Sequence, residues 1–374
     1  MLLHLITSLP MMTCAFFSVL IALGICDVRL RGQKSLLLYM LTATILYVGH
    51  YIFFNRVLFL IPISDTIYVT ANLAVYPLYL IYIIRLTTRF QPHYWLLLLP
   101  AVIGGITTGI LYTNMSSGEI DQFISTFLYQ NSKTGLTGIP YILAMTHVAC
   151  RIVFAIEVIF TVIVGIRLTR RYDRMVDSFY SDTEEKSSRK IRTILYLIII
   201  TAILSFIFNF IGRYRFIDSV WLLAIPSFIF SALLFYIGYV GIHRYFSFQD
   251  LEFNEEELGE EYSSGSNLPQ EENLKNSIIQ RVKEERIYLQ PNLKIEDLAR
   301  LMNTNRTYIY QAINQQMGIT FHEFINRQRI EYAERLMAEN PGMPINDVAL
   351  HSGYTSPSSF YRNLKKYQQK DGTY

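Results

Sequence analysis

Two stretches near the end of the chain decide the fold there: residues 295–316, IEDLARLMNTNRTYIYQAINQQ, and residues 345–369, INDVALHSGYTSPSSFYRNLKKYQQ. In each stretch, apolar residues at helical spacing predict a short helix, which a turn separates from a second helix. Two short helices joined by a tight turn are typical of a helix-turn-helix unit. Asp-Leu-Ala at 297–299 and Asp-Val-Ala at 347–349 lie 50 residues apart, so the chain contains this unit twice.

Capping and turn residues set the ends of these helices. Asn305 and Ser356 are good N-caps for the second helix of each unit, and Gly353 suits a positive φ in the second turn. Gly318 ends the first unit. Residues 321–338 then predict a longer amphipathic helix that connects the two units. Two units with a connecting helix are a far more specific pattern than one unit alone.

These residues resemble the DNA-binding domain of the AraC/XylS family of bacterial transcription regulators. The resemblance is carried by Leu298-Ala299, Ile309-Tyr310, Gly318, Arg327-Gln328-Arg329-Ile330, Ala333, Leu336, Ile345, Asp347-Val348-Ala349, Gly353-Tyr354, Ser359-Phe360-Tyr361-Arg362 and Leu364-Lys365-Lys366. It covers residues 273–374, which lack the usual family ending, Gly-x-x-Pro-x-x-Tyr-Arg. The resemblance implies a rigid pair of units that place two recognition helices in successive major grooves on one face of DNA.

The outward residues of the two recognition helices are the expected contacts to double-stranded DNA. They are Arg306, Thr307, Tyr310, Gln311 and Asn314 in the first unit and Ser356, Ser358, Ser359, Tyr361, Arg362, Lys365 and Lys366 in the second. Arg can read guanine and Gln adenine, whereas Ser and Thr hydroxyls and Lys suit phosphates. We therefore predict that Arg362 and Gln311 read bases while Lys365 and Lys366 anchor the domain. Residues 273–374 hold 14 basic and 10 acidic residues, so we expect affinity to depend on avidity, dimerisation or confinement to a membrane.

The composition of the chain is not that of a water-soluble globule. It is 51% hydrophobic and 17% charged, against about 25% charged for an ordinary soluble domain. A bilayer core about 30 Å thick needs roughly 20 mostly apolar residues of helix. Seven stretches qualify: Leu3–Ile25, Leu36–Phe54, Ile67–Ile84, Tyr94–Tyr112, Tyr141–Ile166, Ile194–Ile211 and Val220–Ile242. The predicted fold is all-α, with a seven-helix transmembrane bundle in residues 1–245 and a tandem helix-turn-helix domain in residues 273–374.

The charges indicate how these parts are connected and oriented. Residues 246–272 are predicted to be an acidic flexible linker, since residues 250–272 contain nine acidic residues and no basic one. Alternate loops between the spans hold 13 and 4 basic residues, and the richer set belongs in the cytoplasm. The N-terminus is then outside, and after seven spans the C-terminal domain lies in the cytoplasm. The predicted location is the bacterial cytoplasmic (inner) membrane.

One predicted span carries a cluster of ionisable side chains, which are costly in a membrane and raise a functional question. His147 and Arg151 are four residues apart and share a helix face, while Glu157 points elsewhere. The cluster either senses a small-molecule or envelope signal or pairs between helices to set the geometry of the bundle.

Two functions from different classes fit these features. The first is a membrane-embedded one-component transcription regulator that binds promoter DNA sequence-specifically and uses the lipid-embedded region as a sensor or anchor. A homodimer would double its DNA contacts, although no heptad seam specifies one. The second is a membrane transporter or sensor whose helical C-terminal domain binds a protein partner. The chain has no H-E-x-x-H, G-x-S-x-G or phosphate-loop motif, so no enzyme activity, catalytic residue, metal or cofactor is expected.

Overall fold

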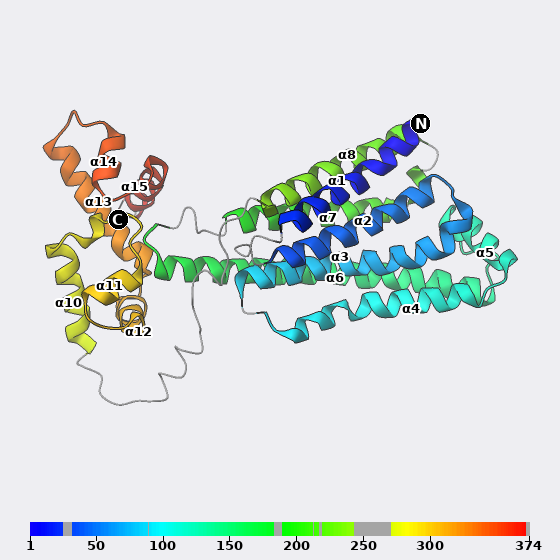
Figure 1. The fold of residues 1–374 in the computed structure, drawn as a ribbon, viewed down its shortest axis with the longest axis horizontal. Coiled ribbons are helices and arrows are strands. Elements are labelled where there is room, and N and C mark those ends of the chain that lie inside the picture. The colour runs from blue at the N-terminus through cyan, green and yellow to red at the C-terminus, as the bar shows by residue number, and fades with distance from the viewer. Residues whose placement is uncertain are drawn as a thin grey trace. The chain divides into compact units, whose positions relative to one another are not determined.

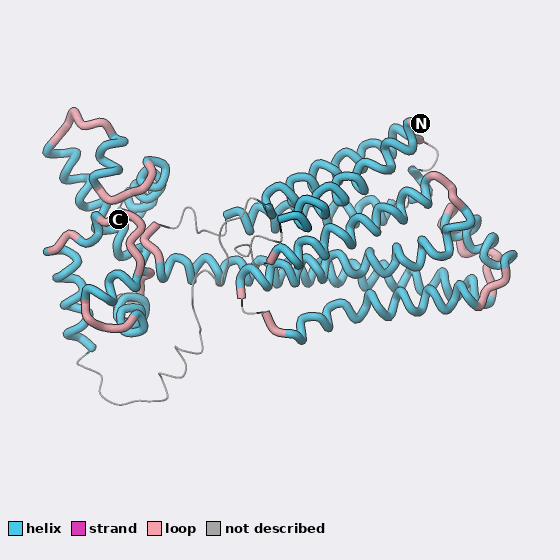
Figure 2. Tube along the Cα trace, viewed as in Figure 1, coloured by secondary structure: helices cyan, strands magenta, loops and turns pink. Residues whose placement is uncertain are grey.

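The computed structural model describes residues 1–24, 32–88, 90–182, 189–211, 213–216, 219–242 and 271–371. These residues form helices and connecting turns, with no strand among them (Figure 2), so the all-α class is confirmed for this part of the chain. The predicted linker, residues 246–272, lies almost entirely outside the described residues. The chain divides into two compact units: Met1–Thr169 with Arg189–Phe248, and Arg170–Ser188 with Gln249–Tyr374.

The first unit is a bundle of long helices. Its α-helices are α1 (Leu2–Gly24), α2 (Gln33–Phe54), α3 (Ile61–Thr87), α4 (Leu99–Thr113), α5 (Ser117–Phe123), α6 (Gly138–Phe179), α7 (Arg189–Ile211) and α8 (Val220–Ile242). Short 3₁₀ segments precede α3, α4 and α8, namely Leu58–Leu60, Pro92–Leu98 and Arg213–Phe216, and a π-helical turn, η3 (Ile124–Leu128), follows α5. The last ten residues of α6 belong to the second unit.

Helix α3 is the centre of this bundle. In its most apolar window 83% of the residues are buried, against 17% to 39% for the other long apolar helices. Helices α2 and α4 pack against α3, and α1 packs against α2 and α8 (Figure 1). Helix α3 is therefore the most buried of these helices, and the others leave more of their apolar side chains exposed.

Six helical stretches among the described residues are long and apolar enough to cross a membrane. They are Leu2–Gly24, Gln33–Phe54, Leu58–Thr87, Pro92–Thr113, Gly138–Phe179 and Val220–Ile242. Each contains most of one predicted span. The remaining predicted span, the sixth in chain order at residues 194–211, falls within α7, where the apolar stretch is the shorter Ile199–Phe208. The predicted count of seven is therefore not confirmed.

The second unit contains the two helix-turn-helix motifs at the predicted positions. Its helices are α10 (Glu271–Glu284), α11 (Ile295–Leu301), α12 (Arg306–Tyr310), α13 (Phe321–Glu339), α14 (Ile345–His351) and α15 (Pro357–Asp371), with a 3₁₀ turn at Ile287–Leu289. The first recognition helix differs from the prediction, because α12 passes into a π-helical turn, η7 (Gln311–Gln316). Helix α13 connects the two motifs.

The predicted caps and turns account for these helix ends. The Asn305 side chain accepts the Tyr308 N–H at 3.1 Å, and the Ser356 hydroxyl accepts the Ser359 N–H at 3.2 Å. Gly353 has φ +81°, and a Cβ added there would lie 2.7 Å from the Leu289 carbonyl oxygen. Only glycine satisfies both the backbone angle and the close approach at this turn.

Candidate nucleic-acid interface

The two recognition helices differ in how exposed their predicted DNA contacts are. In the second motif, five of the predicted contacts on α15 are exposed, namely Ser358, Tyr361, Arg362, Lys365 and Lys366. In the first motif, the predicted contacts on α12 and η7 are all half-buried, namely Arg306, Thr307, Tyr310, Gln311 and Asn314. The second motif thus presents hydroxyl, aromatic and cationic groups to solvent, whereas the first is partly covered.

Two predicted contacts in the second motif have structural roles in the protein itself. Ser359 is 4% exposed, so the prediction that its side chain faces outward is wrong. It lies one helical turn before Asn363, which is also buried and donates to the Ser359 carbonyl at 3.1 Å, so both side chains lie on the inward face of α15. Ser356 is half-buried, because its hydroxyl is the N-cap of α15.

The segment that covers the first recognition helix is residues 178–182, termed the strap, which comprises the end of α6 and the three residues after it. The Phe179 ring stacks on the Tyr310 ring with centroids 5.5 Å apart and planes 11° from parallel. The Ser178 hydroxyl donates to the Asn314 side-chain oxygen at 3.1 Å. Two of the five predicted DNA contacts in the first motif therefore bind the chain itself.

Hydrogen bonds to Ser181 hold the strap on the second unit. The Ser181 N–H donates to the Leu293 carbonyl at 3.0 Å. Its carbonyl accepts from His322 Nδ1 at 2.8 Å and from Asn326 Nδ2 at 2.7 Å, and its hydroxyl lies 3.3 Å from Arg329 Nη2. Both backbone groups and the side chain of one residue are thus satisfied by this unit.

The flanking strap residues reach both motifs. Tyr180 forms an antiparallel bridge with Lys294, which precedes the first helix of the first motif. On the other side, the Asp182 carboxylate accepts a hydrogen bond from the Thr355 hydroxyl, just before α15. The strap therefore contacts the first motif, the connecting helix α13 and the second motif.

Sequence reasoning did not find the strap, although a signal was present. The predicted fifth span ends at Ile166, where hydropathy falls, but the helix continues to Phe179. Tyr172, Val176 and Phe179 recur at helical spacing beyond the apolar stretch, and all three are buried. This periodicity indicates an amphipathic extension of α6 with an apolar face to bury.

A fully buried arginine ties α13 to the segment before the first motif. Arg329 is 0% exposed and donates to the carbonyls of Tyr288 and Gln290, each at 2.7 Å. Its guanidinium also lies 5.4 Å from the centre of the Tyr354 ring. Burial lowers the pKa of Arg329 to about 10, so it stays charged at neutral pH.

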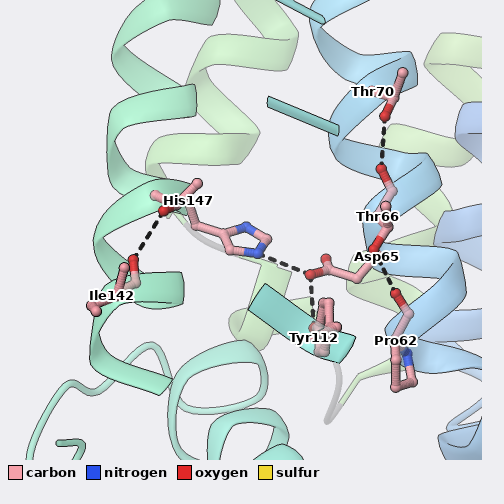
Figure 3. Close-up of polar contacts among 8 residues, drawn as sticks. Pro62, Asp65, Thr66, Thr70, Tyr112, Ile142 and His147 are labelled. Carbon is pink, nitrogen blue, oxygen red and sulfur yellow. Dashed lines mark hydrogen bonds and ion pairs between the residues drawn. The ribbon is translucent and has the colours of Figure 1, made fainter. Parts of the chain in front are cut away.

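In the first unit, His147 on α6 belongs to a buried polar cluster (Figure 3). Its Nε2 atom lies 2.9 Å from Oδ2 of Asp65 on α3, and the Tyr112 hydroxyl on α4 donates to the same oxygen at 2.9 Å. All three side chains are buried. The cluster joins three helices through one carboxylate, and sequence reasoning missed Asp65 because it precedes the predicted span Ile67–Ile84.

The structure separates the other two members of the predicted cluster from this site. Arg151 is exposed, donates to the Asn131 side chain at 3.3 Å and lies over the Phe127 ring, which also contacts His147. The two residues therefore share a helix face, as predicted. Glu157 is half-buried, and neither of its carboxyl oxygens has a hydrogen-bond partner among the described residues.

A cavity of about 110 Å³ lies elsewhere in the first unit, lined by residues of α1, α2, α3, α7 and α8. Its polar lining includes Tyr47, His50, Tyr68, Asn72 and Ser227 among mostly aromatic and apolar neighbours. None of His147, Arg151 and Glu157 lines this cavity. A mostly apolar pocket with a few polar groups is the usual form of a small-molecule site.

Comparisons with known proteins assign the second unit but not the first. Residues 298–369 match a family model described as a helix-turn-helix domain, of AraC type. The chain is 30% identical over 79 residues to the probable transcriptional regulator LumQ of Photobacterium leiognathi, which covers 21% of the chain and 32% of that protein. It is 25% identical over 76 residues to the Msm operon regulatory protein of Streptococcus mutans, or 20% of the chain and 27% of that protein. No solved structure matches the chain.

These matches cover less than a third of each relative, so they describe a domain rather than a whole protein. A third relative, the uncharacterized HTH-type transcriptional regulator YtdP of Bacillus subtilis, is 28% identical over 97 residues, which is 26% of the chain and 12% of that protein. All three alignments span about a quarter of this chain or less. The second unit therefore contains an AraC-type helix-turn-helix domain similar to those of transcriptional regulators.

Proposed function

We propose that the protein is a membrane-embedded one-component transcription regulator that binds promoter DNA through its two helix-turn-helix motifs. The observation that carries the proposal is the pair of capped recognition helices on one connecting helix, with Arg362, Lys365 and Lys366 exposed on the second. A planar guanidinium can bind a guanine edge bidentately, while lysine ammonium groups bind phosphates without reading sequence. The match to a helix-turn-helix domain supports this use of the unit.

The first unit suits a lipid environment. Its helices leave large apolar side chains exposed, among them Ile152, Ile156 and Ile159 on α6. Such a surface is unfavourable in water but natural against acyl chains. The distribution of basic residues supports seven spans, with the N-terminus outside and the second unit in the cytoplasm of a bacterium, at its inner membrane.

We assign signal sensing to the first unit on the strength of its cavity and of the Asp65 cluster. The cavity offers aromatic and aliphatic walls with hydroxyl, imidazole and amide groups, which suits a small apolar molecule carrying one or two hydrogen-bonding groups. His147 and Asp65 couple α6 to the central helix α3, so a change in bundle packing can reach α6.

The DNA-binding part is tested with the full-length protein in lipid nanodiscs, by selection from a random duplex library followed by salt titration. We expect a motif of two short elements about 10 base pairs apart, one helical turn. Arg362→Ala is expected to lower affinity for the selected site by roughly 5- to 150-fold and to relax sequence preference at one position. Lys365→Ala is expected to weaken binding to all DNA sequences alike. It is also expected to reduce the slope of log affinity against log salt concentration by about one.

The matched control is Arg335→Ala, which removes an exposed arginine from α13 outside the recognition helices. It is expected to leave affinity and sequence preference unchanged. If the wild-type protein selects no motif, the helical domain does not read DNA, and the alternative of a membrane transporter or sensor with a protein-binding domain gains support.

The sensing part is tested with a reporter gene placed under the selected site in cells. Ser227→Trp fills the cavity. We expect the reporter output of this variant no longer to respond to the signal, while its DNA affinity in vitro stays unchanged. Ser125→Trp adds the same side chain at an exposed position of η3 and is the control. An unaltered response in the Ser227 variant would exclude the cavity as the sensor.

A further inference from the structure

The strap is far more buried than a solvated loop between two spans would be. Phe179, Tyr180, Ser181 and Asp182 are all buried, although two of the four are polar. Burying polar groups is costly unless each finds a partner. Ser181 and Asp182 have such partners, which indicates a built docking site rather than a chance contact.

Two parts of the docking site bind the backbone of the strap. An edge of backbone next to the first motif pairs with the strap through Leu293 and Lys294. The polar face of α13 binds the Ser181 carbonyl with a histidine and an asparagine, His322 and Asn326. The ligand that this site takes is therefore an extended peptide, and its occupant is a segment of the same chain.

Charge adds to the fit at Asp182. Its carboxylate raises the pKa values of both His322 and Arg329, which places it close enough to interact with each electrostatically. Lys366 on α15 contributes a further positive charge to the same region, because it lowers the pKa of His322. The negative charge of Asp182 on the strap therefore lies in the same region as the positive charges of Arg329 and Lys366.

The docked strap occupies groups that DNA would need. The ring of Tyr310 is covered on one face by Phe179, and the side-chain oxygen of Asn314 accepts from Ser178. A recognition helix must bring such side chains against base edges or phosphates in the major groove. The strap and DNA cannot both bind these two side chains.

We infer that the strap is an autoinhibitory ligand of the DNA-binding unit, which competes with DNA for the first recognition helix. This inference rests on the proposed DNA binding. Release is controlled through α6, because one uninterrupted helix carries His147 in the first unit and ends in the strap. A signal that shifts α6 therefore changes the fraction of molecules in which the strap is docked.

The first experiment weakens docking in the full-length protein in nanodiscs. If the strap is docked in 90–99% of molecules, apparent DNA affinity is reduced by about 10- to 100-fold, and Phe179→Ala or Asp182→Asn is expected to recover most of it. Phe59→Ala and Asp121→Asn make the same changes at exposed positions of the first unit and are expected to have no effect. A loss of affinity in the strap variants would mean instead that the strap braces the two motifs for DNA binding.

The second experiment locks the strap in place. Ser178→Cys with Asn314→Cys, in a background without the natural cysteines, is expected to form a disulfide that lowers DNA affinity at least tenfold, reversibly on reduction. Comparison of the oxidised and reduced states of one protein separates the lock from any direct effect of the substitutions. Equal affinity in both states, or failure of the disulfide to form, would overturn the inference. Failure of the reduced protein and of the wild type to select any DNA sequence would instead contradict the proposed function.

Discussion

At the scale of single residues, the half-buried His322 makes the second unit sensitive to acid. Burial, more than any other cause, lowers the pKa of His322 to about 4, and the nearby Lys366 and Arg329 add to this, while the Ser181 carbonyl and Asp182 oppose it. An unfolded histidine titrates near 6.5, so the neutral folded form is fully stable above that pH and loses stability as pH falls toward 4. We expect the free energy of unfolding of this unit to fall by up to about 3 kcal/mol across that window.

The measurement is the urea midpoint of the full-length protein in nanodiscs. Unfolding is monitored through the signal of a dye attached to a cysteine that replaces the exposed Tyr361. His322→Gln is expected to remove most of the loss between pH 6.5 and 4, and the exposed His351→Gln on α14 to leave it unchanged. A pH profile that His322→Gln does not alter would place the acid sensitivity on other groups.

Arg329 is expected to be the most costly side chain to remove from this unit. Arg329→Met keeps much of the volume but leaves the Tyr288 and Gln290 carbonyls without this donor and removes a positive charge near Asp182. Breaking such a buried set by removing one partner costs about 3–5 kcal/mol. The same urea titration checks this, with the exposed Arg335→Met as the control. A loss below about 1 kcal/mol would show that water replaces the missing donor.

The residues that sequence reasoning identified correctly and those it missed differ in how far away their partners lie. Asn305 and Ser356 cap helices through hydrogen bonds to residues three positions ahead, so the local sequence is enough to predict them. Asp65 and His147 are 82 residues apart in sequence, and the strap meets partners more than a hundred residues away. Only the tertiary fold brings such pairs together, and single-sequence patterns do not encode it.

At the scale of elements, hydropathy located the long helices but not where they end. Helix α3 begins at Ile61, six residues before the predicted span, and α6 continues 13 residues past its predicted end at Ile166. Hydropathy marks the part of a helix that suits lipid, whereas backbone hydrogen bonds continue as long as the chain can bury one face. Asp65 lies in the first of these extensions, and the strap begins at the end of the second.

The packing of α8 on α1 depends on a glycine. A Cβ at Gly238 would lie 2.3 Å from Cγ of Phe17. Relief of this clash requires the whole Phe17 ring, which lies between the two helices, to move. Small residues allow close helix packing in membranes, and overpacking costs about 1–3 kcal/mol. We expect Gly238→Ala to lower the thermal midpoint of the full-length protein in detergent. Gly118→Ala on α5, where no atom lies within 4 Å of the added Cβ, is the control and is expected to be neutral.

At the scale of the whole molecule, the number of spans decides on which side of the membrane the second unit lies. Helix α6 has 42 residues and is about 63 Å long, roughly twice the thickness of a bilayer core, so one end must leave the lipid. The end that leaves carries Arg167, Arg170, Arg171 and Arg174, which favours a cytoplasmic exit next to the strap. With seven spans, positions near the N-terminus and in α15 lie on opposite sides, whereas with six they lie on the same side.

This difference gives a direct test of topology in intact bacterial cells, using single cysteines introduced at the exposed positions Leu2, Gly135 and Lys366 and a membrane-impermeant maleimide. We expect labelling of the first two from outside and of Lys366→Cys only after the cells are permeabilised. Protection of Leu2→Cys together with Lys366→Cys would mean an even number of spans, with both ends inside. Labelling of Lys366→Cys in intact cells would place the helix-turn-helix motifs away from the chromosome and would contradict both the proposed function and the autoinhibition that rests on it.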